Sequence, residues 1–70
     1  MDGSRRDRYL ERRRTVAEID DATLRRELRQ WRENRDAARQ TGAGQAWIEA
    51  LEWIEAIKYE LRSRQTDEAE

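Results

Sequence analysis

The sequence predicts an all-α protein built around an antiparallel helical hairpin, and three features of the chain support this fold class. There is no proline, and the three glycines lie at positions 3, 42 and 44, so residues 4–41 contain no strong helix breaker. Apolar residues recur at helical spacing in residues 20–41 and again in residues 45–64. The turn sequence TGAG at 41–44 separates these segments, and their similar lengths favour antiparallel packing.

The composition indicates a small domain that gains stability from a partner chain. A chain of 70 residues buries a thin core, and domains of this size usually need a disulfide, a metal or association. There is no cysteine and no histidine, which removes disulfides and the commonest metal ligand. Leu, Ile, Val and Phe together are only 10 of 70 residues, a content low enough to raise disorder as an alternative, but three tryptophans favour a folded domain.

The first segment, residues 1–18, is an arginine-rich arm or a short helix. Ser4 and Asp7 have the spacing of an N-cap and the third helical position, a weak capping box. The apolar stripe of this segment is poor, and the sequence leaves both forms open. A helix here would place four residues on one face: Tyr9, Arg13, Val16 and Ala17.

The second segment has two candidate starts. In the first, Asp20 is the N-cap, and Ile19 and Leu24 then take the two positions of a hydrophobic staple. In the second, Thr15 caps a helix with Glu18 at its third position, and a single helix runs through this point. Both starts are compatible with the pattern that follows.

The second segment carries a narrow apolar seam of the kind found in coiled coils. Five residues spaced 4-3-4-3 span an arc of about 80° on a helical wheel. They are Leu24, Leu28, Trp31, Arg35 and Ala38. Gly42 suits the left-handed position that follows a helix, so we expect this helix to end near residue 41.

The third segment, residues 45–64, contains the tetrapeptide Trp-Ile-Glu-Ala twice, at 47–50 and at 53–56. A shift of six residues turns the second copy by about 120° on the helical wheel, so the copies do not stack. The apolar stripe therefore becomes wide, about 160°. It comprises Trp47, Ala50, Leu51, Trp53, Ile54, Ile57 and Leu61, whereas Ile48 and Tyr59 fall outside it.

A stripe this wide is more than one neighbouring helix covers. We therefore expect two hairpins to pair through the third segment into a four-helix bundle homodimer with C2 symmetry. The alternatives are a monomer or a complex with another protein. The predicted self-association or partner interface comprises Trp47, Ala50, Trp53, Ile54, Ile57 and Leu61. The predicted hairpin core comprises Leu24, Leu28, Trp31 and Leu51.

The two tryptophans of the repeat lie on opposite shoulders of the stripe. Trp53 is near Ala46 and Ala50, whose small side chains permit close approach of another helix. We therefore expect Trp53 to face a second chain and Trp47 to support the fold within one chain.

The chain lacks the residues that enzymes use. None of its hydroxyl side chains has a histidine to activate it, and a thin bundle offers little room for a substrate pocket. Glu49, Glu52 and Glu55 have a spacing that di-metal bundles use, but they point away from the apolar stripe. We therefore predict no catalysis, no metal, no cofactor and no small-molecule substrate.

An alternative function is binding of DNA or RNA by the basic arm. Residues 1–41 carry 12 basic and 9 acidic side chains, a net charge of +3, whereas residues 42–70 carry 3 and 7, a net charge of −4. Arginine contacts phosphate in a bidentate manner, and a tyrosine can stack on a base. The candidate contacts are Arg5, Arg6, Arg8, Tyr9, Arg12, Arg13 and Arg14. The chain pI of about 5.6 argues against this alternative.

The sequence as a whole predicts a non-enzymatic helical protein–protein interaction module that acts as an adaptor, inhibitor or assembly subunit. We divide the chain into a basic arm (1–18), a helical hairpin (19–65) and an acidic disordered tail (66–70). The N-terminus has no apolar run, no segment is long enough to span a bilayer, and the acidic third segment suits no membrane surface. We expect a cytoplasmic protein.

Overall fold

All regular secondary structure in the computed structural model is α-helical over the described residues, which confirms the predicted fold class. The structure describes the backbone of residues 2–69 and the side chains of residues 6–65. Over this range the chain forms three helices: α1 (Asp2–Ala17), α2 (Asp21–Thr41) and α3 (Gly44–Ala69). None of these helices is both long enough and apolar enough to cross a membrane.

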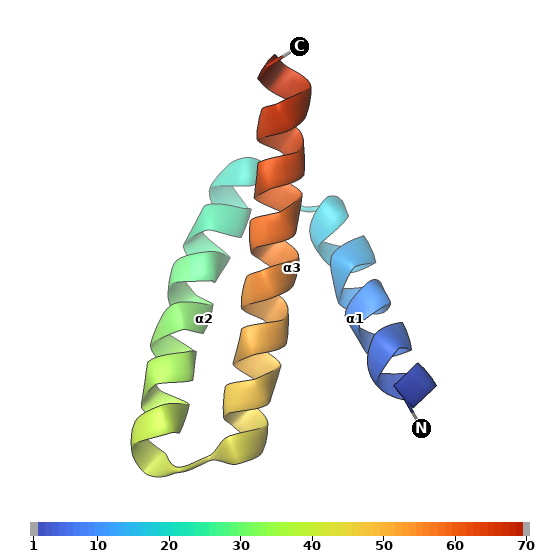
Figure 1. Ribbon diagram of the computed structural model, residues 1–70. Helices are drawn as coiled ribbons and strands as arrows, with labels where there is room; N and C mark the ends of the chain where they lie inside the picture. Colours follow the sequence, from blue (N-terminus) through green and yellow to red (C-terminus); the bar gives the residue numbers. More distant parts are fainter. Residues whose placement is uncertain (1, 70) are drawn as a thin grey trace.

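The helix α3 lies between the other two (Figure 1). The helices α2 and α3 form the antiparallel hairpin, and α1 packs on the other side of α3 and runs in the same direction as α3. The helices α1 and α2 diverge from their short connection at residues 18–20 (Figure 1), so the molecule is broad and flat, measuring 43 × 29 × 16 Å.

The start of α2 at the Asp20 cap is confirmed. Asp20 has extended backbone angles, and its Oδ2 accepts from the backbone N–H of Thr23 at 3.1 Å. The Thr23 hydroxyl donates to the other carboxylate oxygen at 2.7 Å. These hydrogen bonds stabilise the carboxylate and lower the pKa of Asp20. The chain breaks after Ala17, so the alternative of one helix running through residues 15–24 is wrong.

The predicted end of α2 at Gly42 is also confirmed. Gly42 adopts the left-handed conformation with φ of 74°, and the N–H of Ala43 donates to the carbonyl of Ala38 at 2.9 Å. This six-to-one bond defines a Schellman motif, which satisfies a carbonyl that the helix end would otherwise leave unpaired. The sharp turn then allows α3 to begin at Gly44.

The outer ends of α1 and α3 differ from the expectation. The helix α1 begins at Asp2, so Ser4 lies inside the helix and is not the N-cap; its side chain lies outside the described residues. The helix α3 continues to Ala69, five residues past the predicted end of the third helix, and residue 70 is outside the described range. Helix-forming residues without proline or glycine allow this extension.

The core lies where the three helices converge. Each helix contributes to the fully buried cluster of Val16, Leu24, Ala56 and Ile57. Complete burial of a side chain such as Leu24 or Ile57 contributes roughly 1.5–3 kcal/mol. Ala56 was not part of the predicted stripe, and its burial shows that α1 covers a side of α3 that the helical wheel had assigned to solvent.

Candidate interaction surface

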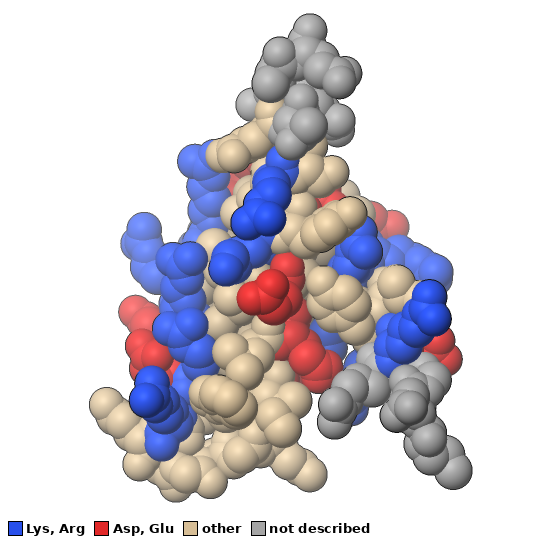
Figure 2. Space-filling view, in the orientation of Figure 1, with Lys and Arg blue, Asp and Glu red and all other residues tan. Residues whose placement is uncertain are grey.

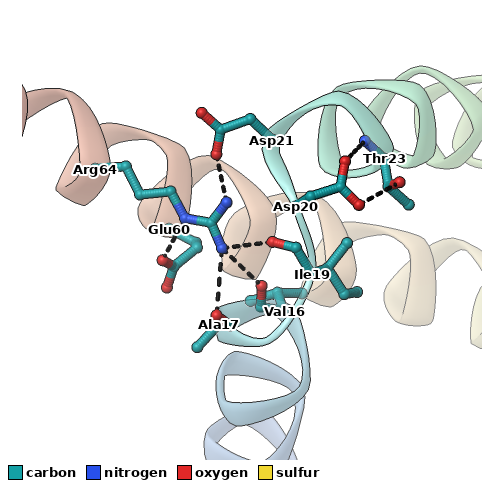
Figure 3. Close-up of polar contacts among 8 residues, drawn as sticks. All are labelled: Val16, Ala17, Ile19, Asp20, Asp21, Thr23, Glu60 and Arg64. Carbon is teal, nitrogen blue, oxygen red and sulfur yellow. Dashed lines mark hydrogen bonds and ion pairs between the residues drawn. The ribbon is translucent and has the colours of Figure 1, made fainter.

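The side chain of Arg64 joins all three helices at the convergent end (Figure 3). Its Nη1 donates to Asp21 in the first turn of α2, and its Nε donates to Glu60 at 2.8 Å. Its Nη2 donates to three backbone carbonyls at 2.6–3.3 Å, those of Val16, Ala17 and Ile19. The bond to Asp21, followed by that to Glu60, raises the pKa of Arg64. A planar guanidinium with five N–H groups can serve this many acceptors at once.

Two tryptophans stack where α2 meets α3. The ring centroids of Trp31 and Trp53 are 5.7 Å apart and the rings are nearly parallel, at 11°. Arg12 of α1 lies over the Trp53 ring, with its Cζ 4.8 Å from the centroid. Trp53 therefore contacts both neighbouring helices within one chain. Trp47 is 39% exposed, although the sequence suggested that it supports the fold within one chain.

The contact between α1 and α3 is made largely by arginines. Nitrogen atoms of Arg8 and Arg12 lie 3.5 and 3.9 Å from the Glu52 carboxylate, and Cζ of Arg13 lies 3.8 Å from the centroid of the Tyr59 ring. Arg12 and Glu52 are largely buried, yet Nε and Nη1 of Arg12 and Oε2 of Glu52 have no hydrogen-bond partner among the described residues. A largely buried charge pair with unsatisfied atoms adds little net stability.

The predicted nucleic-acid contacts on α1 divide into two groups. Arg8, Arg12 and Arg13 are engaged with α3, and Tyr9 is half-buried. Arg6 and Arg14 are exposed, and the side chain of Arg5 lies outside the described residues. Arg8 pairs with Glu52 but its side chain is 54% exposed, so Arg12 and Arg13 are the described arginines of the arm that the contact with α3 makes less accessible.

Most of the predicted interface residues of α3 are already covered within one chain. Ala50, Ile54 and Ile57 are buried, and Leu61 is half-buried beside the core. Of the predicted hairpin core, Leu24 is buried and both Leu28 and Trp31 pack against the core cluster. The remaining predicted core residue, Leu51, lies beside Tyr9 of α1 in a shallow hollow.

Apolar side chains remain accessible on a different side of α3. A hollow of about 310 Å³ is lined by Tyr9, Ile48, Leu51 and Glu52. Tyr59 stands eleven residues after Ile48, about three helical turns, so both point to the same side of α3. Ile48 is 43% exposed and Tyr59 is 52% exposed. We call these four residues the apolar face: Tyr9, Ile48, Leu51 and Tyr59. Glu52 and Glu55 lie between Ile48 and Tyr59 on the same side of α3.

Sequence reasoning missed Ile48 and Tyr59 because it ranked residues by their distance from the centre of the stripe. The sequence did contain a signal: both residues lie on the same side of the helical wheel, outside the stripe centred on Ile54. Arg64 carried no such signal, since an arginine in a polar segment has no distinguishing pattern.

The three glutamates with metal-ligand spacing do not converge. Glu52 pairs with Arg8 and Arg12, while Glu55 lies 4.0 Å from Lys58 Nζ and Glu49 is exposed. No group of three or more metal-ligand side chains occurs in the part of the chain that the structure describes.

Comparison with family models, curated proteins and solved structures gives no match for this chain. The helices and their surfaces are therefore the basis for any assignment of function.

Proposed function

We propose that this protein is a non-enzymatic helical interaction module that self-associates through the apolar face on α3 and α1. The observation that carries this proposal is the exposure of large apolar side chains beside a core of only a few residues. Ile48 and Tyr59 stay close to half exposed, although α3 has neighbours on two sides. A second copy would remove this surface from water, which contributes roughly 25 cal/mol per Å² of apolar area.

The dimer that follows from this surface differs from the bundle of two hairpins that the sequence suggested. With α1 and α2 both occupying the flanks of α3, the open side of α3 meets its symmetry mate, and Tyr9 of α1 joins the contact. A C2 contact uses each residue twice, so a favourable side chain contributes twice per dimer. Such a module would act as an adaptor, inhibitor or assembly subunit.

The test uses a matched pair of substitutions. Ile48→Asp places a charge in the apolar face, where Ile48 is 43% exposed. The control, Leu10→Asp, places the same charge on α1, where Leu10 is 44% exposed. Light scattering at tens of micromolar should give the unmodified chain twice its monomer mass of 8.5 kDa.

Ile48→Asp should weaken the dimer roughly tenfold or more, because a charge would be buried without a partner in both copies. Leu10→Asp should stay dimeric. A monomeric unmodified chain, or equal weakening by both substitutions, would overturn self-association through this face. A monomer would leave another protein as the partner.

The second candidate function is a small DNA- or RNA-binding regulator that uses the N-terminal arm. The exposure of Arg6 and Arg14 favours it, whereas the contacts of Arg8, Arg12 and Arg13 with α3 oppose it. Deleting residues 1–14 should abolish binding if the arm is responsible. Binding that survives this deletion would place the nucleic-acid site elsewhere.

A further inference from the structure

The exposed flank of α2 carries a row of arginines. Arg25, Arg29, Arg32 and Arg39 fall within an arc of about 80° when each residue turns the helix by about 100°. All four are exposed, and they extend over about 21 Å of helix at 1.5 Å per residue. We call these four residues the arginine stripe. Figure 2 shows a column of basic side chains along the α2 edge of the molecule.

The four arginines of the stripe form no ion pair with the acidic side chains beside them. Three carboxylates of α2 lie beside these arginines. Asp21 binds Arg64, Asp36 binds Arg35 at 3.2 Å, and the exposed Glu33 stands four residues after Arg29. Among the described side chains, none of the four stripe arginines has a carboxylate within ion-pair distance. This distinguishes the stripe from the arginines of α1, three of which are held by α3.

An aromatic cleft adjoins the end of the arginine stripe at the hairpin turn. The cleft has a volume of about 480 Å³ and is lined by Ala38, Arg39, Gly42, Ala43, Gly44 and Trp47. Trp47 forms one side and is 39% exposed. A methyl group added at Gly42 or at Gly44 would meet no atom within 4 Å, so the cleft is open. Arg39 belongs to both the stripe and the cleft.

We propose that the arginine stripe and Trp47 form a binding site for single-stranded nucleic acid. Phosphates would lie along α2, and the base beyond Arg39 would stack on the Trp47 ring. A cationic track combined with a stacking aromatic ring is the arrangement by which proteins hold single strands without reading sequence. The arginine stripe is about 21 Å long, which is the length of about six phosphates in a stacked strand that advances 3.4 Å per nucleotide. A duplex keeps its bases stacked inside, so it would contact the arginines alone.

This site is separate from the apolar face. Its arginines lie on α2 and Trp47 lies in the first turn of α3, whereas the apolar face comprises other residues of α3 and Tyr9, so association and nucleic-acid binding can be lost independently. It also differs from the basic arm, because deletion of residues 1–14 would leave the arginine stripe and Trp47 in place.

The experiment measures fluorescence anisotropy of labelled oligothymidylate and oligouridylate of about 15 nucleotides at about 50 mM salt. The test variant is Arg25→Ala/Arg29→Ala/Arg32→Ala. The control is Arg6→Ala/Arg14→Ala/Arg26→Ala, which removes three exposed arginines that lie off the stripe. Alanine is a strong helix former, so both variants should remain helical by circular dichroism.

The stripe variant should lose at least about tenfold in affinity, and the slope of log affinity against log salt should fall by about 2, or 0.7 for each lost phosphate contact. The control should lose much less. Trp47→Ala should cost roughly tenfold for single strands and little for a duplex, whereas Trp47→Phe should retain most of the binding.

Three results would overturn the proposal. The chain does not bind single strands, the stripe and control variants lose the same affinity, or Trp47→Ala leaves the affinity for single strands unchanged. Binding to anionic phospholipid vesicles that depends on the stripe, without binding to oligonucleotides, would also overturn it.

Discussion

The two helices that flank α3 are held to it in different ways. The helix α2 packs through an apolar seam, with Leu24 and Ala38 buried and Trp31 stacked on Trp53, and both of its ends are capped. Among its described side chains, the helix α1 contributes the fully buried Val16 and the partly buried Tyr9. Its other contacts with α3 are ion pairs and arginine–aromatic contacts. Arg64 connects the end of α1 to the hairpin.

This difference indicates that α2 and α3 form the stable unit and that α1 is the more dependent element. Apolar burial is not directional and is largely insensitive to salt. An ion pair with an exposed partner, such as Arg8 with Glu52, contributes only about 0–1 kcal/mol and weakens as salt rises. The helices α1 and α2 also diverge away from the core, which leaves the N-terminal half of α1 with α3 alone (Figure 1).

The largest effect is expected from Leu24→Ala. Leu24 is fully buried at the point where all three helices meet, and truncating a buried leucine costs about 2–5 kcal/mol. Since a small domain has roughly 5 kcal/mol of total stability, both the hairpin and α1 should unfold. Thermal melting followed by circular dichroism would check this. A melt like that of the unmodified chain would show that the convergent end does not hold the fold together.

Replacement of Arg64 should separate the two regions. Arg64→Gln removes the charge and most of the donors that reach Asp21 and the carbonyls at the end of α1, so α1 should loosen while α2 and α3 stay helical. Arg64→Lys keeps the charge but cannot span the acceptors, so it should restore little. Backbone amide NMR shifts would report this. Changes spread equally over α2 and α1 would contradict a role specific to α1.

A smaller effect is expected at the Arg12–Glu52 pair. Glu52→Leu should weaken the α1 contact because it leaves the largely buried Arg12 charge without its carboxylate. Arg12→Leu/Glu52→Leu should recover much of the stability, because apolar residues often replace a poorly hydrogen-bonded buried pair without loss. Denaturant unfolding of both single variants and the double variant measures the coupling. A double variant as unstable as the sum of the single variants would contradict this interpretation.

The smallest effect concerns Asp20 and pH. The pKa of Asp20 is lowered in the folded chain. The carboxylate therefore contributes fully to folding stability above its pKa in the unfolded chain, near 3.9, and this contribution is lost as the pH falls through the lowered pKa of the folded chain. Asp20→Asn keeps the cap but does not titrate, so it serves as the control. The unmodified chain should lose stability relative to this variant below about pH 4. If the melting temperatures of the unmodified chain and Asp20→Asn differed by the same amount at every pH, the prediction would be contradicted.

The hairpin could be predicted because its determinants are local. Asp20 and Gly42 define the ends of α2 through their own backbone conformations, and the spacing of the seam residues indicates which side of α2 meets α3. The burial of Leu24 and Ala38 follows from that spacing. These features require no knowledge of distant parts of the chain.

The position of α1 could not be predicted because arginines and glutamates make most of its contact. A helical wheel assigns Glu52 to solvent, yet Glu52 pairs with Arg8 and Arg12. Ala56, one turn further along α3, is buried in the cluster with Val16. The accessible surface differs as well: Trp53 is half-buried between its neighbours, whereas Ile48 and Tyr59 are exposed. The candidate sites depend on this packing, so only their residue types could be anticipated.

The most direct test of the difference between the two regions is amide hydrogen exchange measured at low and high salt. The amides of α1 should exchange faster than those of the buried parts of α2 and α3, and raising the salt to about 1 M, where the Debye length is about 3 Å, should accelerate α1 selectively. Equal protection of all three helices at both salt concentrations would contradict the account, because it would show that α1 belongs to the same cooperative unit as the hairpin.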